Sequence, residues 1–266
     1  MHLLRRTVRV NILPPGSPAG AKNTYAGFPT MTALGAFYAF EVAVRGEPNP
    51  HTGYLRDIKH IDRALRDTLV PAITAAFAAP HQSSPAHLLA QALPALNTAL
   101  DGGLASVRWH LSPYYSLEVP MPSATSPSRV LIREKFDFAA AHRLHVPTLS
   151  DEANRATFGK CNNRSGHGHN YQFEPCVSVP LTNSSTFNIA TLERLADEII
   201  LERFDHKHLN EDTAEFDPRR GGVNPSVENI AAVFFNLLAP AIAQSGAQLE
   251  HMTVWETDRT SATYPA

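Results

Sequence analysis

The feature that most constrains this chain is the resemblance between its two halves. The ten residues GAFYAFEVAV (35–44) align with GHNYQFEPCV (168–177) at a constant offset of 133, with Gly, Tyr, Phe, Glu and Val matching. Between the halves, PMPSATSPS (120–128) is rich in proline and serine, which favours an extended linker. We therefore expect two related units, 1–119 and 129–266, joined by that linker.

Hydrophobic periodicity predicts a similar order of elements in both halves. In the first half we expect strands at 7–13, 36–46 and 104–111 and helices at 58–77 and 84–100. In the second half we expect strands at 130–142, 167–179 and 248–257 and helices at 189–204 and from Pro225 to about Gly246. The predicted fold class is α+β, with each unit an antiparallel sheet that carries two helices on one face.

Composition excludes several classes of function. The net charge of −2 gives no electrostatic basis for binding nucleic acid or an anionic membrane. Two cysteines are too few for a disulfide framework, which favours a reducing compartment. The sequence also indicates no apolar stretch long enough to cross a bilayer, so we expect a cytoplasmic protein without nucleic-acid or membrane partners.

Three histidines of the second half form a candidate metal site. Residues i and i+2 of a strand share a face, so His167 and His169 would project together. His142 ends the preceding expected strand, where it could supply a third ligand. Three imidazoles leave one position of a tetrahedral zinc ion open, as in catalytic sites. The alternative for an isolated H-x-H is a loop with two exposed histidines.

The two cysteines have different surroundings. Cys161 lies among polar and basic residues in GKCNNR, which favours a reactive thiolate that acts as a base or nucleophile. A small buried residue is the alternative. Cys176 lies within an apolar strand, where we expect it only to pack.

Two acidic positions complete the candidate site. Asp205 precedes His206 at the end of an expected helix, and a carboxylate can fix the tautomer of a histidine that transfers protons. A helix cap or surface pair is the alternative. Glu256 ends the last strand on the face of Met252 and Val254. It either reaches solvent or accepts a ligand with paired N–H donors.

These residues belong to motifs that resemble the 6-pyruvoyl-tetrahydropterin synthase family. FDFAAAHRL, FGKCNNRSGHGHNY, FDHKHLN, PSVENIA and VWETD follow the family's order and approximate spacing over most of 133–260. The resemblance implies the T-fold, in which units associate so that their sheets form a barrel around a channel. It implies Zn²⁺ held by His142, His167 and His169, and proton transfer by Cys161, Asp205 and His206. For substrate binding it indicates Glu256, which would grip the pterin edge, with Ser226 and Glu228 of the PSVENIA motif. By their charge and location alone, Arg143, Lys160, Arg164 and Lys207 are candidates to hold the phosphates.

The resemblance also implies an activity. It is that of a zinc-dependent carbon–oxygen lyase that converts 7,8-dihydroneopterin triphosphate to 6-pyruvoyl-tetrahydropterin with loss of triphosphate. The alternative within the family is 6-carboxytetrahydropterin synthase, which serves queuosine and other 7-deazaguanine nucleosides. Five residues separate Cys161 from His167, which resembles the pyruvoyl-forming branch. RGEPNPHTGYLRDI (45–58) of the first half is more similar to the carboxy-forming branch.

Two rival classes of function remain at this stage. One is a non-catalytic pterin-binding protein whose zinc is structural. The other is a metal hydrolase acting on a purine-like ring. Each would use the same histidines.

The first half departs from the family pattern. It has Leu34 and Ala36 where the offset predicts His167 and His169, and it contains no cysteine. It keeps the family's hairpin end as TGYLRD (52–57), which the second half replaces with NSSTFN (183–188). We predict a catalytically silent copy kept for assembly of a homo-oligomer, with a trimer of two-unit chains as one arrangement.

Overall fold

The structure, a computed structural model, describes residues 1–14, 16–17, 25–77, 84–123, 128–182 and 186–266. It divides into two compact units, Met1–Ile132 with Pro180–Asn183 and Arg133–Val179 with Ser184–Ala266. The boundary falls within strand β5 (Arg129–Glu134). Residues 124–127 of the expected linker, and 183–185 of the replaced hairpin end, lie outside the described residues.

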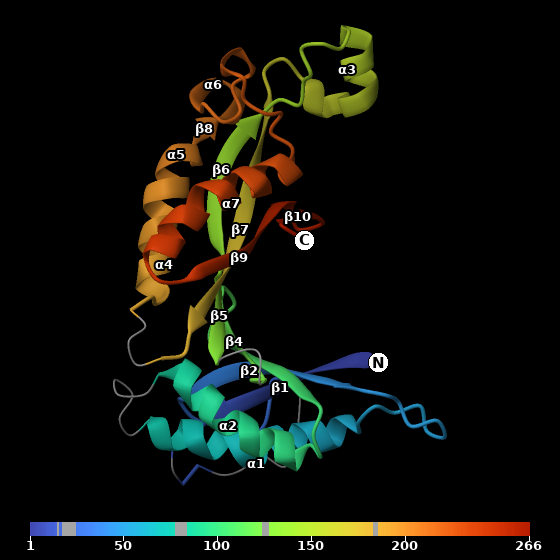
Figure 1. Cartoon of the computed structure of the whole chain (residues 1–266), viewed down its shortest axis with the longest axis vertical. Coiled ribbons are helices and arrows are strands. Elements are labelled where there is room, and N and C mark those ends of the chain that lie inside the picture. The colour runs from blue at the N-terminus through green and yellow to red at the C-terminus, as the bar shows by residue number, and fades with distance from the viewer. Residues whose placement is uncertain (15, 18–24, 78–83, 124–127, 183–185) are drawn as a thin grey trace. The chain divides into compact units, whose positions relative to one another are not determined.

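In its described residues, the first unit is an antiparallel sheet with two helices on one face (Figure 1). The strands lie in the order β1 (His2–Ile12), β2 (Ala36–Gly46), β3 (Leu104–His110) and β4 (Tyr115–Pro120). The helices are α1 (Ile58–Ala76) and α2 (Pro85–Ala99), which pack against each other and against the sheet.

Strand alternation explains the core of the first unit. Val8, Phe40 and Val42 are at most 1% exposed and share one face of the paired strands β1 and β2. Arg6 lies on the same face and forms two hydrogen bonds of 2.8 Å with Asp62 of α1. The apolar face therefore fixes the helix layer, and the bidentate ion pair fixes how α1 lies on the sheet.

The second unit contains a sheet, several helices and a long loop. After β5 its strands are β6 (Phe136–His142), β7 (His167–Pro180), β8 (Lys207–His208), β9 (Gln248–Thr257) and β10 (Thr260–Tyr264). Its α-helices are α3 (Asp151–Phe158), α4 (Ile189–Ala196), α5 (Glu202–Phe204), α6 (Leu209–Asp212) and α7 (Val227–Gln244). Gly159–Asn162 and Pro218–Arg220 are 3-10 turns, and Asp197–Leu201 is a π-helical turn. The strand order is β10-β9-β7-β6-β8, antiparallel except between β6 and β8.

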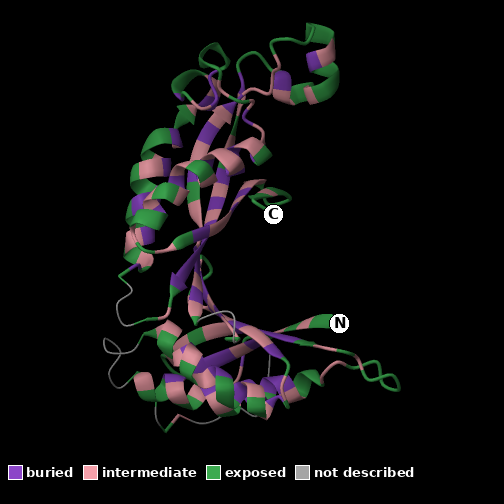
Figure 2. Ribbon diagram, viewed as in Figure 1, coloured by how far each residue is buried: buried purple, intermediate pink, exposed green. Residues whose placement is uncertain are grey.

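An aromatic cluster forms the core of the second unit. Phe138 of β6 stacks on Tyr171 of β7 with 4.8 Å between ring centroids, and Phe234 of α7 lies 5.3 Å from Phe138. Phe173 and Phe204 complete the cluster, and all five side chains are at most 3% exposed. In Figure 2 the buried residues follow strands β6 and β7 and one side of the helices. Burial of these rings sets the position of the strand face that carries the histidines.

Most of the expected elements are confirmed, and the differences have local causes. The expected strand 130–142 is interrupted at Lys135, so it forms β5 and β6. The expected helix 189–204 contains the π-helical turn. Helix α3 and strand β10 were not predicted. Both are short and mostly exposed, so neither has the apolar period that identifies an element in sequence.

Helix α7 corrects the expectation that no apolar stretch of the sequence is long enough to cross a bilayer. Among the described residues it alone has the length and composition to cross a membrane. Ile230, Phe234, Leu238 and Ile242 are fully buried, and the helix packs on β9 and β10. These contacts are those of the core helix of the second unit.

The half-buried carboxyl group of Glu134 favours a pH-dependent stability of the second unit. Burial, the charge of Glu193 and a hydrogen bond with it raise the pKa of Glu134 from 4.5 to about 7. A carboxyl group with a raised pKa in the folded state stabilises that state below its unfolded pKa, and this contribution is lost as pH rises through about 7.

We therefore expect Glu134→Gln to raise the melting temperature at pH 8 and to leave it nearly unchanged at pH 5. Thermal unfolding followed by circular dichroism at both pH values measures the difference. Asp137→Asn, at an exposed position nearby in sequence, is the matched control and should show no such pH dependence. An equal shift at both pH values would contradict the assignment.

Candidate metal and active site

The pairing of β6 with β7 brings three histidines together. His142 lies opposite His167 and Ala140 lies opposite His169, so the three imidazoles share one face of the sheet. The Nε2 atoms of His142 and His167 are 3.1 Å apart, and one nitrogen from each ring lies within 4.8 Å of the others. The convergence expected from the spacing is present in the structure.

Hydrogen bonding fixes which nitrogen of His142 faces the other rings. Its Nδ1 lies 2.7 Å from the carbonyl oxygen of Pro225, an acceptor, so Nδ1 carries the proton. The hydroxyl of Tyr171 lies 3.3 Å from the same nitrogen. Burial lowers the pKa of His142 to about 4, although the Pro225 carbonyl opposes the shift. His142 is therefore neutral near pH 7, and its Nε2 lone pair points at His167.

The other two rings carry nitrogens that are buried without a partner. Nδ1 of His167 and Nε2 of His169 have no hydrogen bond within the described part of the chain. Burial also lowers the pKa of His167, with His169 contributing. Closely spaced imidazole nitrogens without hydrogen-bond partners suit a divalent cation such as Zn²⁺. The residues present therefore fit a metal ion held by all three histidines.

Glu256 lies against this trio. Its Oε1 is 3.5 Å from Nε2 of His142 and 3.6 Å from Nε2 of His169. The side chain is 21% exposed, whereas Met252 and Val254 on the same face of β9 are fully buried. The strand thus ends in a carboxylate that borders both the histidines and solvent. Such a group can accept paired N–H donors from a ligand.

The backbone of Cys161 is hydrogen-bonded to the segment that follows the end of β6. Its carbonyl oxygen accepts the N–H of Leu144, two residues after His142, at 2.9 Å. Its side chain is partly exposed, whereas Cys176 is 1% exposed within β7. Burial raises the pKa of the Tyr171 hydroxyl, and the charge of Glu256 adds to the rise. The more accessible of the two thiols is therefore the one whose backbone is bonded to the segment after His142.

Asp205 and His206 form a separate pair. Asp205 Oδ2 lies 2.8 Å from Nδ1 of His206, and Oδ1 accepts the N–H of Ala139 at 2.8 Å. Burial opposes ionisation, but these hydrogen bonds and the charge of His206 hold the pKa of Asp205 below its usual value. The His206 side chain is 82% exposed. The pair has the chemistry of an oriented proton carrier open to solvent.

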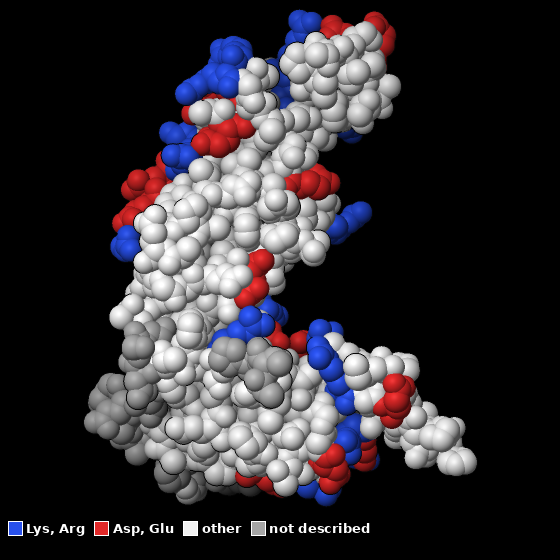
Figure 3. All heavy atoms as spheres, viewed as in Figure 1, with Lys and Arg blue, Asp and Glu red and all other residues white. Residues whose placement is uncertain are grey.

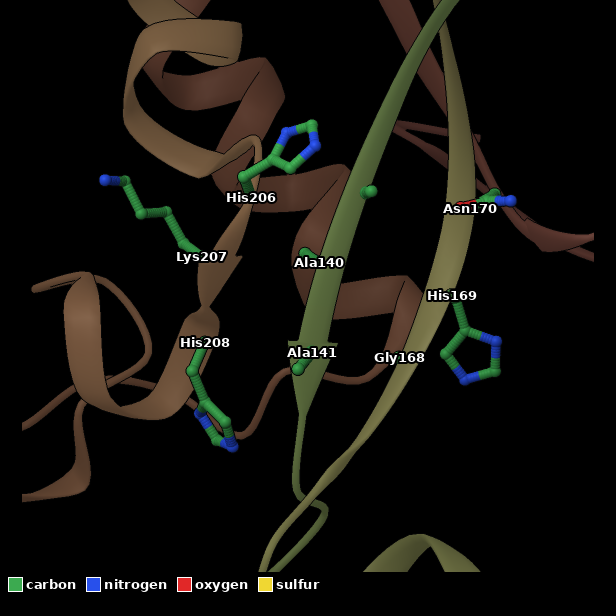
Figure 4. A pocket seen from close by; sticks show the side chains of 9 residues that line it. Ala140, Ala141, Gly168, His169, Asn170, His206, Lys207 and His208 are labelled. Carbon is green, nitrogen blue, oxygen red and sulfur yellow. The ribbon is translucent and has the colours of Figure 1, made fainter.

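The pair and the β7 histidines of the trio, His167 and His169, lie on different sides of strand β6, which itself carries His142. β6 is placed between β7 and β8, and His206 directly precedes β8. In Figure 4, His206 and His169 lie on opposite sides of the paired strands β6 and β7. A hollow of about 500 Å³ along β6 and β7 is lined by His169 of the trio and by His206 and His208. Among the described residues, no hydrogen bond or ion pair joins the pair to the trio.

Comparison with known proteins then decides the family. Residues 131–266 match the family described as 6-pyruvoyl tetrahydropterin synthase. The chain belongs to this family. Its membership agrees with the predicted T-fold class and with the α+β architecture of the second unit.

Individual relatives match the same half of the chain. The 6-pyruvoyl tetrahydrobiopterin synthase of Poecilia reticulata is 35% identical over 129 residues, 48% of this chain and 84% of the relative. A protein named putative 6-pyruvoyl tetrahydrobiopterin synthase in Caenorhabditis elegans is 36% identical over 138 residues, 51% of this chain and 94% of the relative. The solved structure of the Caenorhabditis elegans 6-pyruvoyl tetrahydropterin synthase covers 52% of this chain and 96% of its own, with 31% identity and a TM-score of 0.46.

Four of the remaining candidate substrate-binding residues lie around the Cys161 turn and at the start of α7. Lys160 and Arg164 are exposed, and Figure 3 shows Lys and Arg side chains at the end of the second unit that carries α3 and α6. Ser226 is the N-cap of α7, where its hydroxyl accepts the N–H of Asn229. Glu228 is exposed in the first turn. Substrate binding by these four residues stays a prediction.

In the first unit, the positions that correspond to the trio carry no metal ligands. The offset of 133 relates His167 and His169 to Leu34 and Ala36, and extending the β1–β2 register places Pro14 opposite Leu34, as His142 lies opposite His167. These residues line an apolar hollow of about 270 Å³ with Ile12 and Phe77. A family metal site is not available at these positions.

Sequence reasoning missed several residues that support the site. Tyr171 continues the alternation of His167 and His169, and that alternation could have identified it as the next side chain on the face. No such pattern in the sequence marks Pro225, whose carbonyl contacts His142, or Asn162, which contacts Arg143 and His145. Their roles depend on which loops meet, and no local pattern records that.

We expect one Zn²⁺ per chain in metal analysis of the purified protein. His142→Ala should weaken zinc binding at least about 100-fold, and Tyr171→Phe by about tenfold, because each removes a ligand or its orienting neighbour. Competition with a chromogenic chelator measures both affinities. His206→Ala is the control and should bind zinc normally. Two ions per chain, or normal binding by His142→Ala, would contradict this assignment.

Proposed function

We propose that the second unit is a zinc-dependent lyase that converts 7,8-dihydroneopterin triphosphate to 6-pyruvoyl-tetrahydropterin and triphosphate. The observation that carries the proposal is the convergence of the three histidines beside Glu256, with the Cys161 turn connected to the same strand end. Relatives with more than 30% identity bear the name of that synthase, which supports this choice of activity.

The proposed reaction is a rearrangement coupled to an elimination. The C3′–O bond to triphosphate breaks, and C3′ becomes a methyl group. The two side-chain carbinols become carbonyls while N5 and C6 of the ring each gain a hydrogen, so no external oxidant or reductant is required. The enzyme must therefore hold the ring, accept protons from the side chain and return them elsewhere.

Each group of the site has a role in that scheme. A zinc ion held by His142, His167 and His169 would supply Lewis acidity toward the side-chain oxygens. Glu256 would accept the N3–H and 2-amino protons of the pterin, which form a donor pair suited to a carboxylate. Cys161, as a thiolate, would accept a proton from the side chain. His206, oriented by Asp205, would donate or accept the next one.

We also propose that the active site is completed by a second copy of the chain. The His206 side chain is 82% exposed, and among the described residues no hydrogen bond or ion pair joins the Asp205–His206 pair to the trio, which leaves the pair accessible to a neighbouring copy. A homo-oligomer, as the family resemblance indicates, supplies the pair from a neighbouring copy. The first unit is then a silent copy that serves assembly, and the protein is expected in the cytoplasm.

The two branches of the family differ in the product that they form from this substrate. The spacing of Cys161 and His167 favours the pyruvoyl product, and 6-carboxytetrahydropterin with loss of acetaldehyde is the second candidate. Mass spectrometry of products from 7,8-dihydroneopterin triphosphate separates them, and GTP in a parallel reaction tests the hydrolase alternative. If the zinc-loaded protein forms neither product, the proposed function is wrong.

Cys161→Ala distinguishes a lyase from a pterin-binding protein with structural zinc. We expect turnover to fall at least about 100-fold, because the proton acceptor is lost, while zinc content stays at the wild-type level. Cys176→Ala is the matched control, since its thiol is buried away from the site. Unchanged turnover in the Cys161 variant would favour a different base.

Mixed oligomers test whether the site is shared between copies. Cys161→Ala and His206→Ala chains should each be inactive, and chains denatured and refolded together should recover about one quarter of wild-type activity, because random pairing restores that share of complete sites. If both groups act within one copy, no recovery is expected. The measurement compares the turnover of the refolded mixture with the turnover of each variant refolded alone.

A further inference from the structure

We propose that Asn162 is a positioning residue, which fixes the catalytic thiol by joining the Cys161 turn (Gly159–Asn162) to the segment that follows His142. The inference rests on the proposed function for Cys161. Asn162 itself is assigned no contact with substrate or metal.

The Cys161 turn has little apolar burial to hold it. Gly159 and Lys160 are exposed and Cys161 is only partly buried, whereas Asn162 is 8% exposed. A buried carboxamide needs hydrogen-bond partners, since leaving its oxygen unpaired would cost free energy. The turn is therefore held through the polar group of Asn162.

Three consecutive residues after His142 bond to this turn. The carbonyl oxygen and Oδ1 of Asn162 lie 3.2 and 3.1 Å from Nε of Arg143, which donates to both. Oδ1 of Asn162 is also 3.1 Å from Nδ1 of His145. Between them, the N–H of Leu144 donates to the carbonyl oxygen of Cys161 at 2.9 Å. One side-chain oxygen thus takes part in two of the contacts that align the turn.

The segment on the other side of these bonds is itself fixed. Asn210 accepts the N–H of Arg143 at 2.7 Å and donates to its carbonyl oxygen at 3.0 Å. Asn224 accepts the N–H of His145 at 3.1 Å. Because Arg143 directly follows the buried His142, the position of Cys161 relative to the trio is transmitted through Arg143 and Asn162.

This arrangement gives Arg143 a role other than phosphate binding. Its Nε is engaged by Asn162, and its backbone by Asn210. A phosphate ligand would chiefly affect substrate affinity, whereas a positioning contact affects the geometry of the reacting groups and hence kcat. The two roles therefore differ in which kinetic constant responds to substitution.

The test compares Asn162→Ala, Asn162→Asp and Asn163→Ala in the full-length, zinc-loaded protein. Asn162→Ala removes the shared acceptor, so we expect kcat to fall at least about tenfold with KM and zinc content unchanged. Asn162→Asp keeps an oxygen at the Oδ1 position and should recover most of the loss. Asn163 is exposed and its Oδ1 accepts only the nearby N–H of Ser165, so Asn163→Ala is the matched control.

Two readouts do not depend on turnover. Hydrogen exchange of peptides covering 143–146 and 159–166 should become about tenfold faster in Asn162→Ala but not in Asn163→Ala. Alkylation of Cys161 by iodoacetamide should approach the rate of denatured protein, and Cys176 is too buried to interfere. If Asn162→Ala does not fold, Arg143→Lys serves as the second variant. It keeps the positive charge but loses the planar Nε–H that donates to Asn162, so it should show the same faster exchange and alkylation.

The outcomes separate this inference from the proposed function. Unchanged exchange and alkylation in Asn162→Ala overturn the inference, and so does faster exchange with an unchanged kcat. A fall in affinity alone on changing Arg143 would assign that residue to substrate instead. If the wild-type chain does not act on the pterin triphosphate, the proposed function fails, and exchange and alkylation still decide whether Asn162 holds the thiol.

Discussion

The register between β6 and β7 is the constraint on which the candidate site depends. It places His142 opposite His167 and, two residues along β7, brings His169 onto the same face. A slip of one residue would turn the histidines of one strand to the other face and expose its phenylalanines. At the start of β7, a side chain at Gly166 would lie 2.6 Å from Nε2 of His208 and 2.9 Å from the carbonyl oxygen of His142. The site therefore requires glycine there, with φ of 69°.

Different physical interactions hold the different parts of the site. Aromatic burial beneath α7 fixes the strand face of the trio, because the Phe138 ring lies 4.8 Å from that of Tyr171 and 5.3 Å from that of Phe234. Carboxamide hydrogen bonds fix the loop that carries Cys161. The backbone of Ala139 fixes Asp205 and His206. The histidine trio thus borders the core, while Cys161, Asp205 and His206 lie on more exposed elements, as their proposed roles in proton transfer require.

The two units show what the same scaffold does with and without these residues. Both place helices on one face of an antiparallel sheet, and both pair their first two strands over long stretches. Where the second unit has imidazoles, the first has Pro14, Leu34 and Ala36. The strand pairing of the first unit therefore persists without polar ligands, since the buried valines of β1 and β2 and Phe40 hold it.

The sequence alone determined three features. These are the elements with strong apolar periods, the shared strand face of His167 and His169, and the family of the second half. Those features are recorded locally, since alternation and motif spacing act over a few residues. It could not determine that Glu256 borders the trio, that the Pro225 carbonyl selects the tautomer of His142, or that Asn162 meets Arg143 and His145. It also gave no sign that Asp205 and His206 lie across β6 from His167 and His169. These contacts join residues far apart in the chain, and only the packing of strands and loops decides which of them meet.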